Sequence, residues 1–294
     1  MPNRTEPVVG KHSLSQFIRT NCLRQLAFNL YPDNNDYAQK RAQLQMPYPQ
    51  SPRPGLRQVQ TAGDEWQAEK LHDLTQTFGA QSIVGSGYTL QSGQVRYKQI
   101  QLAAHLSTTT PTKFIVESTF SIGNTFQQAL GVVGHATQYS LQYGELRPDI
   151  IEVLPAATFS SLISADGTIS SPPSGDARLQ LRIIDIKLSA DPSPAYFAEV
   201  AFYSMALAGW LHDQGLAGQF VVVPDAAVWP GTHEASKLVQ ASRQAQQQAV
   251  TPSIAQLWAA MQEDLETSPF EVFAFRVRRF FQSDLPSALA NHWS

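Results

Sequence analysis

The stretch "IIDIKLS", residues 183–189, places two charged side chains inside an apolar segment with the composition of a β-strand. Asp185 and Lys187 are two positions apart, so a strand directs both side chains to the same face. A buried charge costs much free energy unless it has a partner. The pair therefore indicates either a local ion pair at the end of a strand or part of a functional site.

The longer segment "RLQLRIIDIKLS", residues 178–189, alternates in a way that assigns its two faces. One face is polar at first and apolar later, in the order Arg178, Gln180, Arg182, Ile184, Ile186 and Leu188. We therefore expect the even-numbered residues of the second half to face the core. Asp185 and Lys187 are then predicted to face a polar cleft.

A second aspartate, Asp149, opens another strand candidate in "RPDIIEVLP", residues 147–155. The polar loop of residues 163–177 joins the two segments, which predicts an antiparallel pair. Two aspartates that converge repel each other unless a cation lies between them, and Mg²⁺ prefers such oxygen ligands. A lysine beside them suits phosphoryl chemistry, because it stabilises negative charge or orients a water molecule bound by the metal.

The rest of the chain predicts helices packed on a sheet, which is an α/β or α+β fold. Helices are expected over residues 14–30, with a Ser13–Gln16 capping box, and in the segment 62–80, where Gln67 lies on the apolar stripe. Further helices are expected over residues 124–130, 194–215, 234–249 and 252–267, with Ser193 as the N-cap of the second. Strands are expected over residues 113–120, 136–144 and 218–224, a loop over 46–55, and either type over 270–281.

Composition limits the classes of protein. The chain of 294 residues is 43% hydrophobic, and it has neither a membrane-length apolar run nor an N-terminal signal core, so we expect a cytoplasmic protein without membrane contact. The single cysteine, Cys22, cannot form an internal disulfide or hold zinc or an iron–sulfur cluster alone. The formal net charge of −3 gives no overall sign of nucleic-acid binding, although a local basic cleft remains compatible with it.

The motif "PD" followed by "DIK" resembles the signature of the PD-(D/E)xK nuclease superfamily. Three other segments resemble RecB- and AddB-like nucleases and the CRISPR-associated RecB-like exonucleases. These segments are "SLSQFIRTNCLRQLAFNLYP" (13–32), "GDEWQAEKLHDL" (63–74) and "YFAEVAFYSMAL" (196–207). The resemblance covers residues 13–223 in the family's order.

The resemblance implies a single domain, residues 1–294, with a restriction-endonuclease-like core over about 13–223 and a C-terminal helical extension over about 224–294. It also implies a DNA nuclease that depends on Mg²⁺ or Mn²⁺. Its metal ligands would be Asp149, Asp185 and the backbone carbonyl of Ile186, and its catalytic lysine would be Lys187. Tyr203, with Glu199 four positions earlier on the same helix face, would orient the substrate or the lysine.

The chain departs from the family pattern at two of these positions. Gln67 stands where the family has a histidine or glutamate, so it is either a weak metal ligand or an ordinary hydrogen-bonding amide. Glu65 or Glu69 could replace it, but both lie off the inward stripe. Glu199 stands where glutamine is usual. Three further cysteines that some relatives use are absent, so no iron–sulfur cluster is expected.

Other candidate residues have structural interpretations that we favour. His72 and His135 suit hydrogen-bonded structural positions better than metal sites, and Cys22 suits a small buried hydrophobe. Arg276, Arg278 and Arg279 alternate with aromatics in "FRVRRFF" and are candidates for contact with a phosphate backbone. A solvated helix or strand face is the simpler interpretation of this cluster.

Three functions are therefore compatible with the sequence. The first is a DNA nuclease that works with a helicase, an ATPase or another protein partner in repair, recombination or anti-phage defence, as the resemblance implies. The second is a catalytically weak or inactive subunit of the same fold that binds DNA or a partner as a scaffold. The third is an unrelated enzyme in which "DIK" is a coincidence.

Overall fold

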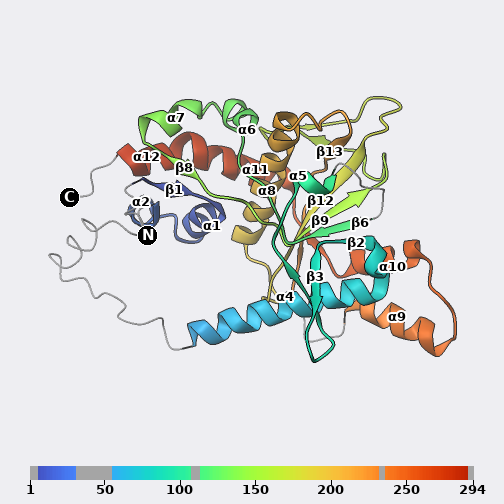
Figure 1. Ribbon diagram of the computed structural model, residues 1–294. Helices are drawn as coiled ribbons and strands as arrows, with labels where there is room; N and C mark the ends of the chain where they lie inside the picture. Colours follow the sequence, from blue (N-terminus) through green and yellow to red (C-terminus); the bar gives the residue numbers. More distant parts are fainter. Residues whose placement is uncertain (1–5, 31–54, 107–112, 232–235, 291–294) are drawn as a thin grey trace.

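The computed structural model describes residues 6–30, 55–106, 113–231 and 236–290, and a mixed β-sheet lies at its centre (Figure 1). The nine strands of this sheet follow the order β11-β10-β13-β12-β9-β6-β2, and β14 and β15 continue the sheet beside β12. Their bounds are β2 Ile83–Val84, β6 Lys113–Val116, β9 Ile150–Leu154, β10 Leu162–Ile163, β11 Ile169–Ser170, β12 Leu179–Ile186, β13 Phe220–Val222, β14 Ala227–Trp229 and β15 Glu266–Thr267. Helices cover both faces, so the predicted α/β class with a mixed central sheet is confirmed.

Strand β12 organises the sheet. It pairs antiparallel with β9, as the sequence predicts, and parallel with β13 along its first half and β14 along its second half. Strand β9 also pairs antiparallel with β6. The register places Val116, Ile150 and Ile184 in one row across the three strands, which fixes the position of every residue near the ends of these strands.

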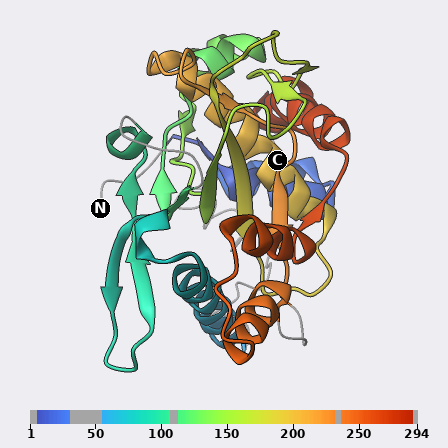
Figure 2. The same cartoon turned by 90° about the vertical axis from the view of Figure 1, so that its right-hand side faces the viewer.

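One face of the sheet packs against α4 (Leu56–Phe78), α9 (Lys237–Gln247) and α10 (Ile254–Glu263). Figure 2 shows these three helices below the sheet, with α4 seen nearly end-on. Leu74 of α4 packs in one apolar cluster with Phe114, Ile184 and Trp229, all of which are buried. Ile184 and Ile186 therefore face this core, as predicted, whereas Leu188, beyond the end of β12, is exposed.

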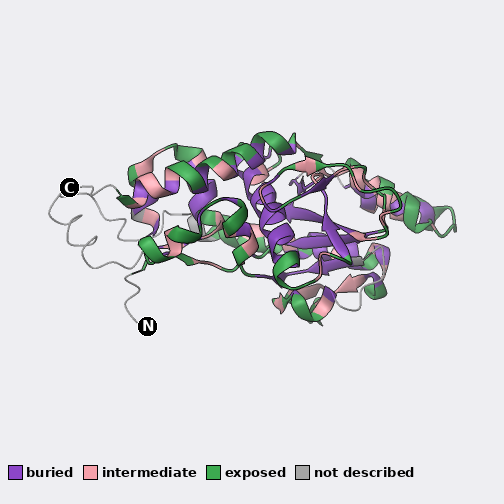
Figure 3. Ribbon diagram, turned by 90° about the horizontal axis from the view of Figure 1, so that it is seen from above, coloured by how far each residue is buried: buried purple, intermediate pink, exposed green. Residues whose placement is uncertain are grey.

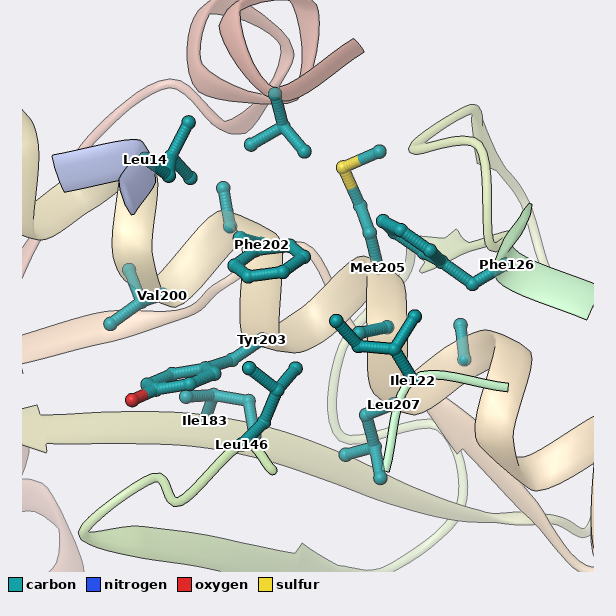
Figure 4. Close-up of a cluster of buried hydrophobic side chains, with 14 of the residues drawn as sticks. Leu14, Ile122, Phe126, Leu146, Ile183, Val200, Phe202, Tyr203, Met205 and Leu207 are labelled. Carbon is teal, nitrogen blue, oxygen red and sulfur yellow. The ribbon is translucent and has the colours of Figure 1, made fainter. Parts of the chain in front are cut away.

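The other face packs against α8 (Pro194–Asp213), which begins after Ser193 as the sequence predicts. Helices α1 (Lys11–Thr20), α6 (Asn124–Ala129) and α11 (Phe270–Arg279) surround α8, so nearly all of its length is buried (Figure 3). Figure 4 shows Phe202 and Met205 of α8 near Leu14 and Phe126. A Cβ atom at Gly209 would lie 2.8 Å from the backbone nitrogen of Phe126, so this close helix contact requires glycine.

The N-terminal helix differs from its prediction. The structure has two helices, α1 and α2 (Leu23–Leu30), which are separated at Asn21. Asn21 has a left-handed φ of 47°, and its N–H donates to the Phe17 carbonyl oxygen at 2.7 Å, so it ends α1 as a C-cap. Helix α1 also begins earlier than predicted, with Gly10 as its N-cap and Ser13 in its first turn.

Another predicted segment differs in part, and an undecided segment is now assigned. Residues 136–144, predicted as a strand, contain the end of α7 (Val133–Gln138) and then β8 (Gln142–Tyr143), which pairs parallel with β1 (Val8–Val9). The undecided segment 270–281 is helical: α11 continues through a π-helical turn, Phe280–Asp284, into α12 (Leu285–Ala290). Of the loop predicted over residues 46–55, all but Gly55 lies outside the described residues.

The segment of residues 80–119 links α4 to the centre of the sheet. It contains a short 3₁₀ turn (Ala80–Ser82), the hairpin β3 (Ser86–Thr89) and β4 (Val95–Lys98), β5 (Ile100–Gln101), α5 (Ala103–Leu106) and β7 (Ser118–Thr119). The predicted strand 113–120 is therefore interrupted at Glu117, between β6 and β7.

The C-terminal region is more than the predicted helical extension. Strands β14 and β15 belong to it and extend the central sheet, because β14 pairs with β12 directly. Its last helices, α11 and α12, share one apolar core with α1, α2 and α8. None of the described helices is both long and apolar enough to span a membrane.

Candidate active site

Three carboxylates lie side by side at one end of the sheet. The register joins Val116 to Ile150 and Ile150 to Ile184. In the next row stand three acids: Glu117 directly follows Val116, Asp149 directly precedes Ile150, and Asp185 directly follows Ile184. Asp149 and Asp185 are neighbours in one row across the sheet, and Gln67 of α4 contacts both Asp149 and Glu117, so the three acids gather at this end of the sheet, where α4 and α8 both approach it.

Glu117 is the residue of this row that the sequence prediction missed. It follows the buried β6 and has a left-handed φ of 53°, and its N–H donates to the Asp149 carbonyl oxygen at 3.0 Å. A glutamate rarely adopts this conformation, and such strain is concentrated at functional sites. A signal was present in the sequence: an acid directly follows the apolar run of "FIVE", much as Asp185 follows "RII".

Gln67 reaches the row from α4. Its Nε2 atom donates to Asp149 Oδ1 at 2.9 Å and also contacts Glu117 Oε1. The structure thus brings Gln67 to the predicted place, but its amide nitrogen faces the carboxylates, and a nitrogen that donates in this way is not a metal ligand. Glu65 and Glu69, the alternatives on the same helix, are both exposed.

Asp185 and Lys187 lie under the first turns of α8. The Lys187 ammonium group pairs with Asp185 and, at 2.9 Å, with Glu199 Oε2. Asp185 is fully buried, and 16% of the Lys187 side chain is exposed. The predicted open cleft is therefore a largely closed polar site, because α8 covers this face of β12, and Lys187 is the member of the pair that reaches solvent.

Asp149 is also tied to β12. Its Oδ2 atom accepts a hydrogen bond of 2.6 Å from the backbone N–H of Ile186. The contact of Ile186 with the site is therefore made by its N–H, and ligation by its carbonyl oxygen stays a prediction. With Gln67 on one oxygen and Ile186 on the other, the Asp149 carboxyl group is fixed in position.

The pKa values of the carboxyl groups show that the acids outnumber their cationic partners. Burial and the neighbouring Asp185 raise the pKa of Asp149 well above its ordinary value. Burial alone would raise the pKa of Asp185 too, but the charge of Lys187 holds it below its ordinary value. Burial also raises the pKa of Glu117, and Arg147 offsets part of this effect. Asp149 and Glu117 therefore bind protons more readily than isolated carboxyl groups do.

Lys187 is a cation in this environment. Burial lowers the pKa of Lys187, but the carboxylates of Asp185 and Glu199 outweigh burial and raise it well above its ordinary value. A lysine with a raised pKa does not accept a proton from water near neutral pH. Lys187 is consequently suited to stabilising negative charge.

Tyr203 connects this site to Arg147, another cationic residue beside the carboxylates. Its hydroxyl donates to the Arg147 carbonyl oxygen at 3.2 Å, and the Arg147 guanidinium pairs with Glu117 at 3.4 Å. Tyr203 is buried, and Figure 4 shows its ring beside Ile183 and Leu146. It therefore positions the Arg147 backbone, and a direct contact with substrate would need this packing to open.

The other predicted binding residues have intramolecular partners. Arg278 donates to the Asp166 carbonyl oxygen at 2.8 Å, and Arg279 lies 3.8 Å from Asp284. Arg276 lies against the Phe273 ring. These arginines are on α11, on the outer side of α8, and no hydrogen bond or ion pair described in the structure connects them to the carboxylate row.

The remaining candidates behave as structural residues. His72 accepts a hydrogen bond from the Val95 backbone N–H at 3.2 Å, and His135 packs against Tyr139 with 5.8 Å between ring centroids. Cys22 is a free, half-buried thiol between α1 and α2. His72 therefore has the hydrogen-bonded position that we favoured, whereas His135 Nδ1 is buried without a hydrogen-bond partner and Cys22 is less buried than predicted.

The donor set fits a hard divalent cation. Asp185 Oδ1 is buried without a hydrogen bond, Oδ2 pairs with the Lys187 ammonium group, and both lie beside Asp149 in a row of carboxylate oxygens, the atoms that such a cation prefers. Within the described residues, no three His, Cys, Asp or Glu side chains are arranged to hold a metal as they stand. The Gln67 amide group bridges Asp149 and Glu117, so a metal shared by those two acids requires this amide to turn or withdraw.

Comparison of the chain with protein-family models, with curated proteins and with solved structures finds no match.

Proposed function

We propose that the protein is a metal-dependent deoxyribonuclease that hydrolyses phosphodiester bonds, with Mg²⁺ or Mn²⁺ as cofactor. The row of Glu117, Asp149 and Asp185 beside the protonated Lys187 supports this proposal most directly. Such a site combines a surplus of carboxylate oxygens, which suits a divalent cation, with a fixed ammonium group, which suits a phosphate oxygen.

Each residue then has a defined task. The carboxylates of Glu117, Asp149 and Asp185 would hold the metal, which would supply Lewis-acid chemistry at the phosphate. Lys187 stabilises the negative charge that develops on the phosphate oxygens. Glu199 fixes the Lys187 ammonium group from α8, at 2.9 Å, so that this charge has a defined position.

A partner protein belongs to this proposal. The formal net charge of −3 gives no sign of a broad basic surface for holding DNA, and the three arginines of α11 are partly committed to internal contacts. We therefore propose that a helicase, an ATPase or a similar cytoplasmic partner delivers the DNA, in repair, recombination or anti-phage defence.

A second function is favoured by one observation. The amide nitrogen of Gln67 occupies the space between two of the three carboxylates, which suits a subunit that retains the nuclease fold but binds no metal. Such a subunit would bind DNA or a partner protein as a scaffold.

The decisive experiment incubates linear and circular DNA with the protein and either Mg²⁺ or Mn²⁺, beside the Lys187→Ala variant. We expect cleavage by the wild type and a loss of about 10²–10³-fold in the variant, as for removal of one transition-state donor. Circular dichroism checks that the variant is folded. Equal cleavage by the two proteins would refute the nuclease assignment, and absence of both cleavage and metal binding would favour the scaffold.

A further inference from the structure

A cavity adjoins the carboxylate row of Glu117, Asp149 and Asp185. Its volume is about 510 Å³, and it lies between the start of α1, the end of α2 and the segment of residues 144–147 that follows β8. Arg147 lines this cavity and also pairs with Glu117 at 3.4 Å, so one side chain forms a wall common to both. A molecule in the cavity would therefore contact the edge of the candidate active site.

Two cations line the cavity near this common wall. Lys11 lies with its Nζ atom 5.7 Å from the centroid of the Tyr203 ring, and the Tyr203 hydroxyl contacts the Arg147 backbone. About half of the Arg147 side chain is exposed, so its guanidinium is available to a ligand. Lys11 and Arg147 together suit a phosphate group.

The cavity also presents acceptors. The Glu145 carboxylate lines it together with Gln99, which donates to Glu145 Oε2 at 3.4 Å, and both residues are exposed. Because the Gln99 amide donates toward Glu145, its own oxygen and the free carboxylate oxygen remain to receive donors. Carboxylate oxygens of this kind accept hydrogen bonds from the exocyclic amino group of a nucleobase.

Cations beside acceptors in one cavity suit a nucleotide. We propose that this cavity is a nucleotide subsite next to the carboxylate row, with phosphate at Lys11 and Arg147 and an amino-bearing base at Gln99 and Glu145. The inference rests on the proposed nuclease function and deepens it. It implies that the nucleotide beside the scissile bond is unpaired, because a paired base has no free Watson–Crick edge, and that cytosine is favoured over uracil or thymine.

The test compares two ligands that differ in one group, deoxycytidine 3′,5′-bisphosphate and deoxyuridine 3′,5′-bisphosphate, without metal, by ligand-observed NMR titration. We expect the cytidine compound to bind the wild type about tenfold more tightly, as one hydrogen bond to a charged acceptor predicts. Glu145→Gln should remove this preference, and Lys11→Ala should weaken both ligands about tenfold, with Lys11→Arg restoring binding. Arg243→Ala, an exposed cation on α9 on the other side of the sheet, is the matched control and should bind as the wild type does.

The outcomes separate the subsite from the nuclease. Equal binding of both ligands to the wild type, or no effect of Lys11→Ala and Glu145→Gln, would overturn the subsite even if DNA is cleaved. Binding that depends on these residues, in a protein that cleaves no DNA, would support the subsite and refute catalysis.

Discussion

Two buried ion pairs lie on opposite faces of strand β12, and they differ in how far their polar atoms are satisfied. Arg182 and Glu152 face α10, and Asp185 and Lys187 face α8. The Arg182 guanidinium is 2.6 Å from Glu152 Oε2, and the other Glu152 oxygen accepts from Trp258 Nε1 at 2.6 Å. One carboxylate therefore faces one guanidinium group, and both carboxylate oxygens accept from donors.

The Asp185–Lys187 pair has neither property. Asp185 Oδ1 lacks a hydrogen bond although Oδ2 pairs with Lys187, and the acids Asp149, Glu117 and Glu199 lie around this pair. A pair that is saturated stabilises one structure, whereas an unsaturated, acid-rich cluster retains affinity for a cation. An unsatisfied acceptor and a surplus of acids, and not burial or charge alone, therefore distinguish the Asp185–Lys187 pair from the Arg182–Glu152 pair.

The largest expected effect concerns stability. Arg182→Met should lower the free energy of unfolding by about 3–5 kcal/mol, because it leaves the Glu152 carboxylate buried without a cation. Urea denaturation measures this loss. The double variant Arg182→Met, Glu152→Leu should recover most of it, and a loss below about 1 kcal/mol in the single variant would contradict the structural role of the pair.

The second prediction concerns metal binding and pH. Because the pKa of Asp149 is raised in the folded protein, the stability of the metal-free protein should fall as pH rises from near 3.8 through the raised pKa. A divalent cation at the proposed site would compete with protons there, and its stabilising effect should therefore grow with pH, to about 2.7 kcal/mol at a hundredfold excess over Kd.

Thermal unfolding with and without Mn²⁺, over a series of pH values, measures this linkage. The Asp185→Asn variant is the control, and its melting temperature should not respond to Mn²⁺. A stabilisation that decreases as the pH rises would contradict exchange of a proton for a metal at Asp149.

The contrast between the two pairs also marks what the sequence could and could not predict. The alternation along β12 correctly assigned Ile184 and Ile186 to one core and Asp185 to the other face. It gave no sign that Arg182 is buried, because its partner Glu152 is 30 residues earlier and meets it only through strand pairing. Local patterns predict faces, and tertiary pairing decides which polar residues are buried on them.

The same limit explains why the sequence patterns did not reveal Glu117 as a site residue or the helix break at Asn21. Glu117 joins the site through the register of β6 with β9 and a left-handed backbone, neither of which periodicity reveals. At Asn21, the apolar spacing continues through Cys22 and Leu26, so it predicted one helix where the left-handed Asn21 produces two.

The third prediction tests Glu117 as a member of the cluster. Glu117→Gln should weaken Mn²⁺ binding by about 10–100-fold, because it removes one charge from the carboxylate row. Isothermal titration calorimetry measures the affinity. Glu69→Gln, an exposed acid on α4, should bind metal as the wild type does, and equal affinities in all three proteins would exclude Glu117 from the site.

The smallest expected effect concerns Gln67, whose amide group donates to two of the carboxylates in the cluster. Its Nε2 atom supplies Asp149 and Glu117 with a neutral donor where a cation would otherwise lie. Gln67→Glu removes this donor and adds a charge, so the metal-free protein should melt at a lower temperature while Mn²⁺ binds about tenfold more tightly, or ~1.4 kcal/mol. The melting temperature should fall while the affinity for Mn²⁺ rises. A residue that only supports the fold would change stability without improving metal affinity. A variant that is destabilised and also binds Mn²⁺ more weakly would show that the Gln67 amide group holds the carboxylates in place for the metal and does not compete with it.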